Sequence, residues 1–419
     1  MKGRRYIMHL DGDAFFVSVE AAKDPRLRGR PVVTGQERGI ASAMSYEAKA
    51  LGITRAMPIF QIRRQFPQVA VVDSDYESYA VFSKRMMDIV RRYTDVVEEY
   101  SIDECFADFT DVPGFKKDPL PVLSRLKGEI GKELGISVSL GLASTKSLAK
   151  MASKSKKPDG LTIVCPEDVT SLLGKTPVDK VWGIGSATAI SLRKKGITTA
   201  LDLASKPAAW VSESFSKPLE EMHLELNGVS VHPVATGSEP QRSIMKTRTF
   251  FPASDDSSYV FSELSKNLEG ACRRARELGL YAKDVSVYLK TKDLSYANAS
   301  RKLSLPSNGS FQIVREAKKA FDEIFERGRL YRATGAILCG LVPEEAVQED
   351  LFGGARAAEK GGKVLEAVDR INKKYGKSLV HMASSSRSLH RERRREKKAL
   401  FMPRGSSKRL SVPYLGEAR

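Results

Sequence analysis

The stretch YIMHLDGDAFFVSVE (residues 6–20) decides the fold, because a short apolar run ends there in an acidic side chain. Its first five residues predict a buried strand that stops at Asp11. An amphipathic helix is predicted to follow, since Phe15, Phe16 and Val19 recur at helical spacing. The end of a strand in a sheet is rigid, so it can direct the Asp11 carboxylate into a cleft.

A second acidic pair, Asp103 and Glu104, is predicted near the bend of a β-hairpin with arms at residues 96–100 and 105–109. Mg²⁺-type cations prefer carboxylate oxygens, and two such ions about 4 Å apart can activate a hydroxyl and stabilise a leaving oxygen. With Asp11, the pair therefore forms a candidate metal site for phosphoryl transfer. Neighbours on a regular strand point to opposite faces, so the hairpin must bend or twist there. A solvated turn is the alternative interpretation.

The chain is too long for one core, and its pattern predicts several domains. Helix and strand signals alternate up to residue 166. Short helices with little strand signal predict a small all-α domain at 166–233, and polar residues with two prolines predict an exposed linker at 233–241. Residues 243–341 follow the order β-α-β-β-α-β, which is typical of a split βαβ domain. Beyond residue 344 one helix is predicted, at 364–375.

The chain is strongly basic, with a net charge of +18 and a pI near 9.6. An anionic polymer is therefore the expected partner. Residues 355–419 contribute a net +12 of this charge, and their composition predicts a disordered tail. The run at 391–398 is interpreted as a solvated basic segment, with auxiliary DNA contact as the second interpretation.

The four cysteines are scattered, without a Cys-x-x-Cys pair or a close histidine. This spacing argues against a structural zinc site or a disulfide framework and suits a reducing cytosol. The N-terminal apolar stretch is too short for a secretory signal, and no run approaches the ~20 residues of a membrane span. A cytoplasmic location is expected.

Several blocks of the sequence carry a specific resemblance. LDGDAFFVSVE (10–20) and YSIDECFAD (100–108) resemble the two metal-binding motifs of the Y-family translesion DNA polymerases, and the bacterial DNA polymerase IV type is the most similar. SYEAKALGI (45–53) is similar to the fingers motif of that family. The segments GLASTK, KMAS and KKPDGL, within residues 141–161, are similar to its second palm block. These blocks stand in the order and spacing of the family, and the likeness covers residues 6–352.

The resemblance implies an α+β multidomain fold, a right-hand polymerase with a ferredoxin-like palm. It implies low-fidelity translesion synthesis, in which dNTPs are added to a primer 3′-hydroxyl, and leaves no region for a proofreading exonuclease. The implied parts are a palm at 1–11 and 76–166, small fingers at 12–75, a helical thumb with a helix–hairpin–helix at 167–232, a linker at 233–241, a βαββαβ little finger at 242–343, and a clamp-binding motif with a flexible basic tail at 344–419.

The resemblance also implies roles for single residues. Asp11 and Asp103 would ligate two Mg²⁺ ions, for which Mn²⁺ could substitute, and the Gly12 carbonyl would complete a shell. Glu104 would help to hold the catalytic metal. Phe16 matches the sugar-discriminating position, where its ring would collide with a ribose 2′-hydroxyl. Without the resemblance, core packing on the same helix would be the preferred interpretation of Phe16.

Four residues match nucleotide contacts of the family: Phe15, Tyr46, Lys49 and Lys157. The sequence departs from the family at two positions nearby, since arginine is common where Lys49 stands and threonine where Ala43 stands. Lysine keeps the charge but loses the planar grip of a guanidinium on a phosphate. Alanine offers no hydroxyl. Nucleotide binding is therefore expected to be weaker or shared with other donors.

The glycines Gly183 and Gly185 lie in VWGIGS, a segment that resembles a helix–hairpin–helix clamp on the DNA backbone. Glycines at a helix start let backbone N–H groups approach a phosphate, although a tight turn between helices is the alternative. The little finger carries basic residues on or beside its strands, which suit phosphate contacts. The predicted DNA contacts are Lys246, Arg248, Lys290 and Arg301.

The segment QEDLF resembles the sliding-clamp-binding peptide of bacterial polymerases, in which Gln348, Leu351 and Phe352 would dock in an apolar groove. The expected partners are primer–template DNA, dNTPs and a bacterial sliding clamp, and a monomer without membrane association is expected. Two other functions fit part of the pattern. A palm-type nucleotidyl cyclase would have no use for the helical clamp and the basic terminal domain. A DNA-binding scaffold without catalysis would not need the intact carboxylate set.

Overall fold

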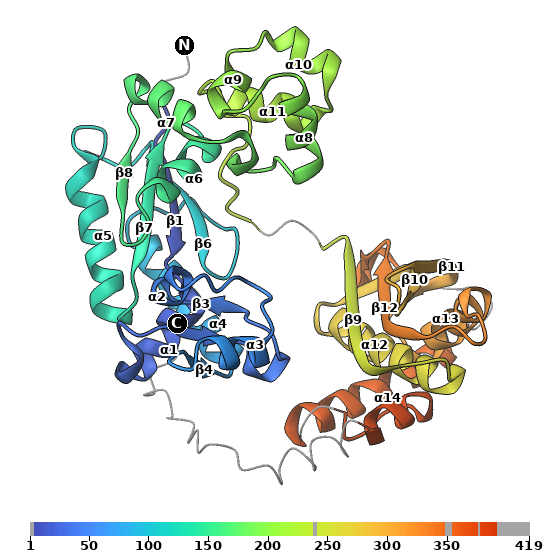
Figure 1. The fold of residues 1–419 in the computed structure, drawn as a ribbon. Coiled ribbons are helices and arrows are strands. Elements are labelled where there is room, and N and C mark those ends of the chain that lie inside the picture. Colours follow the sequence, from blue (N-terminus) through green and yellow to red (C-terminus); the bar gives the residue numbers. More distant parts are fainter. Residues whose placement is uncertain (1–3, 238–240, 348–353, 376–377, 392–419) are drawn as a thin grey trace. The chain divides into compact units, whose positions relative to one another are not determined.

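The computed structural model describes residues 4–237, 241–347, 354–375 and 378–391 (Figure 1), and for 354–361 only the backbone. The chain divides into two compact units, which meet in sequence between residues 238 and 239. Within the described ranges, no helix is both long enough and apolar enough to cross a membrane.

The first unit is built on a five-stranded sheet in the order β5-β6-β1-β7-β8 (Figure 1). The central strand pairs antiparallel with a neighbour on each side, and the last two strands of the order are parallel. This is the ferredoxin-like palm that the sequence predicts. The strands are β1 (Ile7–Gly12), β5 (Val97–Glu99), β6 (Glu104–Asp108), β7 (Val138–Ala143) and β8 (Leu161–Ile163).

Helices cover both faces of the palm sheet, and alternation along β1 shows which side chains face which helices. Met8 and Leu10 belong to one core with the side chains of α4 and α5, whereas Ile7 belongs to another core with those of α6. Because side chains alternate along a strand, His9 and Asp11 follow Ile7 onto the α6 face. The helices are α4 (Tyr76–Arg91), α5 (Pro119–Leu134) and α6 (Lys146–Ser155).

The fingers segment forms a small three-stranded sheet in the order β3-β2-β4, with its own apolar core. The helix α1 (Phe15–Lys23) lies within the segment predicted as the fingers, but it also packs against the palm. Its residues Phe15 and Val19 lie in the palm core, because the chain turns directly from β1 into the helix. The other elements are β2 (Val32–Thr34), β3 (Ala43–Met44), α2 (Tyr46–Ala50), α3 (Ile59–Gln65) and β4 (Ala70–Val72).

The thumb segment forms short helices, as its sequence pattern predicts, and a buried carboxylate ties it to the palm. Glu225, with no exposed surface, accepts hydrogen bonds from the backbone N–H groups of Ser147 (3.1 Å), Val231 (2.8 Å) and His232 (3.1 Å). The helices are α7 (Val169–Lys175), α8 (Ser186–Lys194), α9 (Ala200–Ala204), α10 (Ala208–Ser214) and α11 (Lys217–Leu226).

The predicted linker is not exposed along its whole length. Val234 is buried in the core shared by the palm and thumb, and the Ala235 N–H donates to Glu98 Oε2 at 2.7 Å. The prediction of an exposed segment is therefore wrong for Val234, whereas Pro233 and residues 235–237 are exposed.

The second unit contains a four-stranded antiparallel sheet in the order β11-β10-β12-β9, and α12 and α13 pack on one face of it (Figure 1). β9 and β10 are parallel and separated by β12, so the predicted split βαβ arrangement is confirmed. The elements are β9 (Ser243–Ser254), α12 (Ser257–Glu277), β10 (Leu280–Thr291), β11 (Tyr296–Ser307), α13 (Ser310–Ile324), β12 (Tyr331–Cys339) and β13 (Val342–Pro343).

The basic tail contains more structure than its composition predicts. The predicted helix at 364–375 begins earlier, as α14 (Gly354–Tyr375). Arg276 of α12 forms a two-pronged ion pair with Asp369 of this helix, with N···O distances of 2.6 and 3.0 Å. Further along, the Met382 N–H donates to Glu269 at 3.1 Å. The prediction of disorder is wrong for these residues, because specific polar contacts with α12 hold a segment that composition alone marks as hydrophilic.

Candidate active site

Asp11 and Glu104 are direct partners in the register of the antiparallel strands β1 and β6. Directly opposite residues of such a pair place their Cβ atoms about 4.5–5.5 Å apart on the same face. Asp103 precedes the strand and lies in the hairpin bend, where its carbonyl accepts a hydrogen bond from the Gly12 N–H at 2.8 Å. Asp103 is therefore outside the regular strand, and only Glu104 is bound by the alternation of side chains along β6.

Basic side chains contact two of these carboxylates. Lys157 Nζ forms an ion pair with Asp11, and Lys150 Nζ forms one with Glu104. His9 Nε2 lies 3.4 Å from Glu104 Oε2. Asp103 instead accepts a hydrogen bond from the Ser101 hydroxyl at 2.6 Å.

The electrostatics of the site are those of closely spaced acids. Burial raises the pKa of Asp11, Lys157 opposes this rise, and the nearby charges of Glu104 and Asp103 add to it. Burial also acts to raise the pKa of Glu104, but hydrogen bonds from His9 and Lys150 outweigh it and lower this pKa to about 2. A cation beside Asp11 would relieve the mutual repulsion of the three carboxylates.

The three carboxylates lie at adjacent backbone positions, but their side chains do not converge on one point. Within the described parts of the chain, no three His, Cys, Asp or Glu side chains are grouped closely enough to hold a metal ion. The contacts with lysine, histidine and serine account for this orientation. The donor set nevertheless fits a hard divalent cation, since it consists of the oxygens of three carboxylates and the backbone carbonyl of Gly12.

The close approach of α6 to the sheet brings its basic residues to the carboxylates. A Cβ on Gly141 of β7 would lie 2.2 Å from the Ala149 carbonyl oxygen and 2.3 Å from the Ser153 nitrogen. Only glycine fits there, so the helix lies directly on β7. Ser153 consequently reaches His9 Nδ1 at 2.7 Å, and Lys150 reaches Glu104 from the same helix.

Asp13 is a functional candidate that the sequence pattern alone does not single out. It is almost completely buried and accepts hydrogen bonds from the Ser139 hydroxyl (2.8 Å), the Asp159 N–H (2.7 Å) and the Tyr46 hydroxyl (3.4 Å). These partners come from β7, the loop after α6 and the fingers. The signal was present in the sequence, since Asp13 stands two residues after Asp11, but its burial could not be seen there.

The predicted nucleotide contacts gather beside Asp13. Lys157 Nζ lies 3.8 Å from Asp13 Oδ1, and Lys49 Nζ lies 4.3 Å from the centre of the Tyr46 ring. Burial lowers the pKa of Lys49, and the nearby charge of Lys157 lowers it further. Two lysines and a tyrosine therefore form a positively charged group next to the carboxylates, which suits a polyphosphate.

The two phenylalanines at the start of α1 lie in different surroundings. Phe16 is partly buried and stacks on Tyr79, with ring centroids 4.3 Å apart and planes 10° apart, while Tyr76 meets it edge-on at 5.5 Å. Phe15 is buried in the palm core. A nucleotide contact by Phe15 could therefore come only from its backbone, whereas the Phe16 ring has a rigid aromatic support.

The predicted DNA-binding residues are separated by the structure. Gly183 has φ +84°, which favours glycine, and Gly185 caps α8. In the second unit, Lys290 lies on the sheet face that the helices leave open, since the alternate residues of β10 are in the core. The other three lie on the helix-covered face or its margin: Lys246 beside Gly270, Arg248 near Glu263, and Arg301 paired with Glu323. Gln348, Leu351 and Phe352 lie outside the described residues.

Two family models match the chain. The impB/mucB/samB family model matches residues 10–154, and the model of the C-terminal domain of that family matches residues 241–351. The first range holds all three candidate carboxylates, and the second covers the sheet of the second unit.

Curated relatives and solved structures agree with the family models. The chain is 34% identical to DNA polymerase IV of Moorella thermoacetica over 90% of this chain and 96% of the relative, and 31% identical to DNA polymerase IV 1 of Bacillus subtilis over 91% and 93%. A chimera of the Y-family polymerases Dbh and Dpo4 matches 81% of this chain and all of its own, with a TM-score of 0.72 and 25% identity. A structure of DinB from Sulfolobus solfataricus matches the same shares with a TM-score of 0.53 and 25% identity. The chain therefore belongs to the Y family of translesion DNA polymerases, and it is a DNA-directed DNA polymerase of the DNA polymerase IV type.

Proposed function

We propose that this polymerase extends primers past damaged template bases by two-metal nucleotidyl transfer, with Asp11, Asp103 and Glu104 as the carboxylate ligands. The observation that carries the proposal is the direct pairing of Asp11 with Glu104, next to the bend that holds Asp103. Mg²⁺ ions bound to these groups would activate the primer 3′-hydroxyl and stabilise the pyrophosphate leaving group. The Gly12 carbonyl, at the end of β1, is the fourth protein donor.

Lys157 is proposed to exchange partners when substrates bind. Lys157 neutralises Asp11 in the structure, and it would turn to the nucleotide triphosphate once a metal neutralises that carboxylate. Lys49 and Tyr46 would hold the same triphosphate from the fingers side. Asp13 would keep Tyr46 and the backbone of residue 159 in place, since it accepts hydrogen bonds from both.

Phe16 is proposed to select the deoxyribose sugar. Its support by Tyr79 and Tyr76 favours this role over simple core packing, because a ring held on one side can present a fixed surface on the other. A ribose 2′-hydroxyl would then meet carbon atoms that cannot move away.

DNA contacts are proposed at two places. The backbone of the turn with Gly183 and Gly185 would bind a phosphate at the start of α8. In the second unit the open sheet face, with Lys290, would follow the DNA backbone. Lys246, Arg248 and Arg301 lie on the helix side or its margin, so they would be secondary contacts. Docking on a sliding clamp through residues 348–352, monomeric action and a cytoplasmic location remain part of the proposal.

Primer extension on templates with a single abasic site or a bulky adduct tests the proposed function. The purified chain should extend the primer past the lesion in Mg²⁺. Extension should stop when EDTA chelates the metal. A mismatched primer incubated without dNTPs should stay intact, because no proofreading nuclease is proposed. If the chain binds primer–template but adds no nucleotide with any divalent metal, the scaffold function takes the place of this proposal.

A further inference from the structure

The ammonium group of Lys150 lies in an aromatic cage between the palm and the thumb. Its Nζ atom lies 4.5 Å from the ring centre of Tyr100, 5.5 Å from that of Trp182 and 5.9 Å from that of Phe106. The side chain of Lys150 is only 6% exposed. An ammonium group held against aromatic faces and shielded from water interacts strongly with the few anions within its reach.

Glu104 is the carboxylate that pairs with this caged lysine. Lys150 and His9 both contact Oε2 of Glu104, so one oxygen of the carboxylate is held from two sides. His9 in turn contacts the Ser153 hydroxyl at 2.7 Å. The direction of the Glu104 side chain is therefore set by groups that are themselves fixed by packing.

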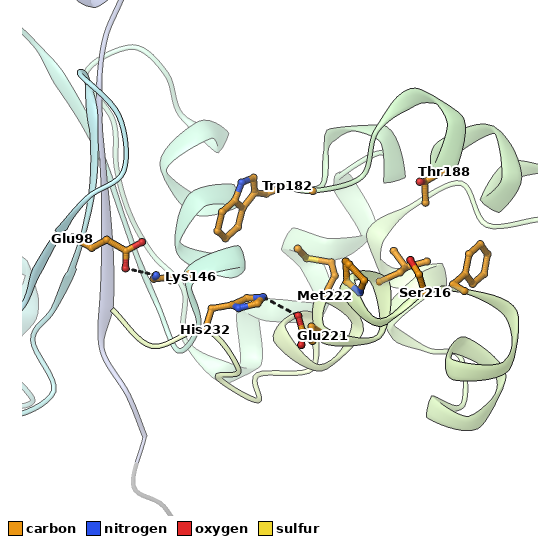
Figure 2. A pocket seen from close by; sticks show the side chains of 12 residues that line it. Glu98, Lys146, Trp182, Thr188, Ser216, Glu221, Met222 and His232 are labelled. Carbon is orange, nitrogen blue, oxygen red and sulfur yellow. Dashed lines mark hydrogen bonds and ion pairs between the residues drawn. The ribbon is translucent and has the colours of Figure 1, made fainter. Parts of the chain in front are cut away.

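Trp182 is the one member of the cage that comes from the thumb segment. Its indole Nε1–H donates to the Tyr100 hydroxyl at 3.1 Å, and its ring lies 5.6 Å from that of Phe106. Trp182 lines a cavity of about 510 Å³. Figure 2 shows it there with palm side chains such as Lys146 and thumb side chains such as Met222. The ring is thus held by palm residues on one side and borders open space on the other.

We infer that Trp182 is a positioning residue for Glu104 and acts through Lys150, so that the seating of the thumb sets the orientation of a metal-binding carboxylate. The inference rests on the proposed function of Glu104. Trp182 stands immediately before Gly183, in the turn proposed to bind a DNA phosphate. Because that contact would be made by the backbone of the turn, the Trp182 side chain remains available to hold Lys150 and, through it, Glu104.

Single-turnover primer extension with three variants tests this coupling. Trp182→Leu removes the ring and should lower the rate of nucleotide addition by about tenfold, the effect of roughly 1.4 kcal/mol on a barrier, while the Kd for primer–template stays unchanged. Trp182→Phe keeps an aromatic face and should restore most of the rate. Trp210→Phe is the matched control, since Trp210 lies elsewhere in the thumb, against Phe215 and Lys195.

A double-mutant cycle identifies the path of the effect. Lys150→Met should slow nucleotide addition, and adding Trp182→Leu to it should cause no further loss, because both changes act on one chain of contacts. If the two losses multiply, Trp182 does not act through Lys150 and the inference is wrong.

Fluorescence supplies a readout that needs neither metal nor activity. The chain has two tryptophans, so Trp210→Phe leaves Trp182 as the only one. In EDTA and without DNA, Glu104→Gln should shift the emission of Trp182, since loss of the carboxylate frees Lys150 within the cage. An unchanged spectrum would overturn the inference, and this arm decides the matter even if Trp182→Leu fails to fold.

The outcomes separate this inference from the proposed function. A wild type that does not extend primers in Mg²⁺ contradicts the proposed function. If the wild type is active and a folded Trp182→Leu variant adds nucleotides at the same rate, only the role of Trp182 is contradicted. A raised Kd for DNA at an unchanged rate would make Trp182 a DNA contact instead and would also overturn the inference.

Discussion

Asp11 and Glu104 lie directly opposite each other on two adjacent antiparallel strands of the palm sheet, although they are far apart in the sequence. The register fixes this relationship, because β1 is paired on both sides and buried along its length. A shift of one residue would turn Asp11 into the apolar core. The sheet thus specifies both the core and the position of the candidate catalytic carboxylates.

Acid stability should depend on His9. Burial lowers its pKa from the ordinary 6.5 to about 4, so between these pH values the unfolded chain binds more protons than the folded protein. The free energy of unfolding therefore rises with pH across this range, by roughly 3 kcal/mol at most for this group. His9→Asn should flatten this part of the profile, measured by denaturant unfolding in EDTA. An unchanged slope in His9→Asn, compared with the wild type under the same conditions, would contradict this prediction.

Sugar selectivity should depend on the Phe16 ring. Phe16→Ala removes the surface that Tyr79 supports, so incorporation of ribonucleotides relative to deoxyribonucleotides should rise by at least about tenfold, or ~1.4 kcal/mol of discrimination. The ratio of kcat/KM for the two sugars measures this change. Tyr79→Phe keeps the stack and loses only the hydroxyl that donates to Glu20, so selectivity should be retained. Unchanged selectivity in Phe16→Ala would assign the ring to packing alone.

The join between palm and thumb should depend on Glu225. Glu225→Ala leaves three backbone N–H groups without their acceptor in a buried place, which should cost about 2–4 kcal/mol of stability. A lower melting temperature in differential scanning calorimetry would report this loss. Glu213 is exposed in the same segment, and Glu213→Ala should change stability by less than about 0.5 kcal/mol. Equal melting curves for both variants would show that the Glu225 carboxylate does not stabilise the contact between palm and thumb.

DNA affinity should distinguish the two faces of the second unit. Lys290→Ala should weaken primer–template binding and reduce the slope of log K against log salt by about one, as expected for the loss of one phosphate contact. Arg301→Ala should leave this slope nearly unchanged, because Arg301 is paired with Glu323 on the helix side. The reverse result would move the DNA to the helix-covered face.

Much of this structure could be predicted from local pattern. The strand that carries Asp11, the hairpin around Asp103 and the split βαβ order of the second unit all follow from periodicity and turn signals, and each is present. The strand bounds differ slightly, since β1 continues to Gly12 and β6 begins at Glu104. These features are local, so a short window of sequence contains the physical information that determines them.

The remainder depended on contacts between distant segments. The face on which Lys246 and Arg301 lie is set by strand register, which their own sequence windows do not reveal. The ordered part of the basic tail depends on the ion pair between Arg276 and Asp369. The cage around Lys150 needs residues from the hairpin, α6 and the thumb turn. Tertiary packing determines such features, and the local pattern of one sequence does not reveal which distant segments pack together.

The central claim is that Asp11, Asp103 and Glu104 together bind the cations that drive nucleotide addition. The most direct test compares Asp103→Ala with wild type in Mg²⁺-dependent primer extension, with the Kd for primer–template measured in parallel. The variant should lose on the order of 10³-fold or more in rate and keep its DNA affinity, while Glu99→Gln, which changes an exposed acid on the neighbouring strand β5, should remain active. Primer extension by Asp103→Ala at the wild-type rate would contradict the account.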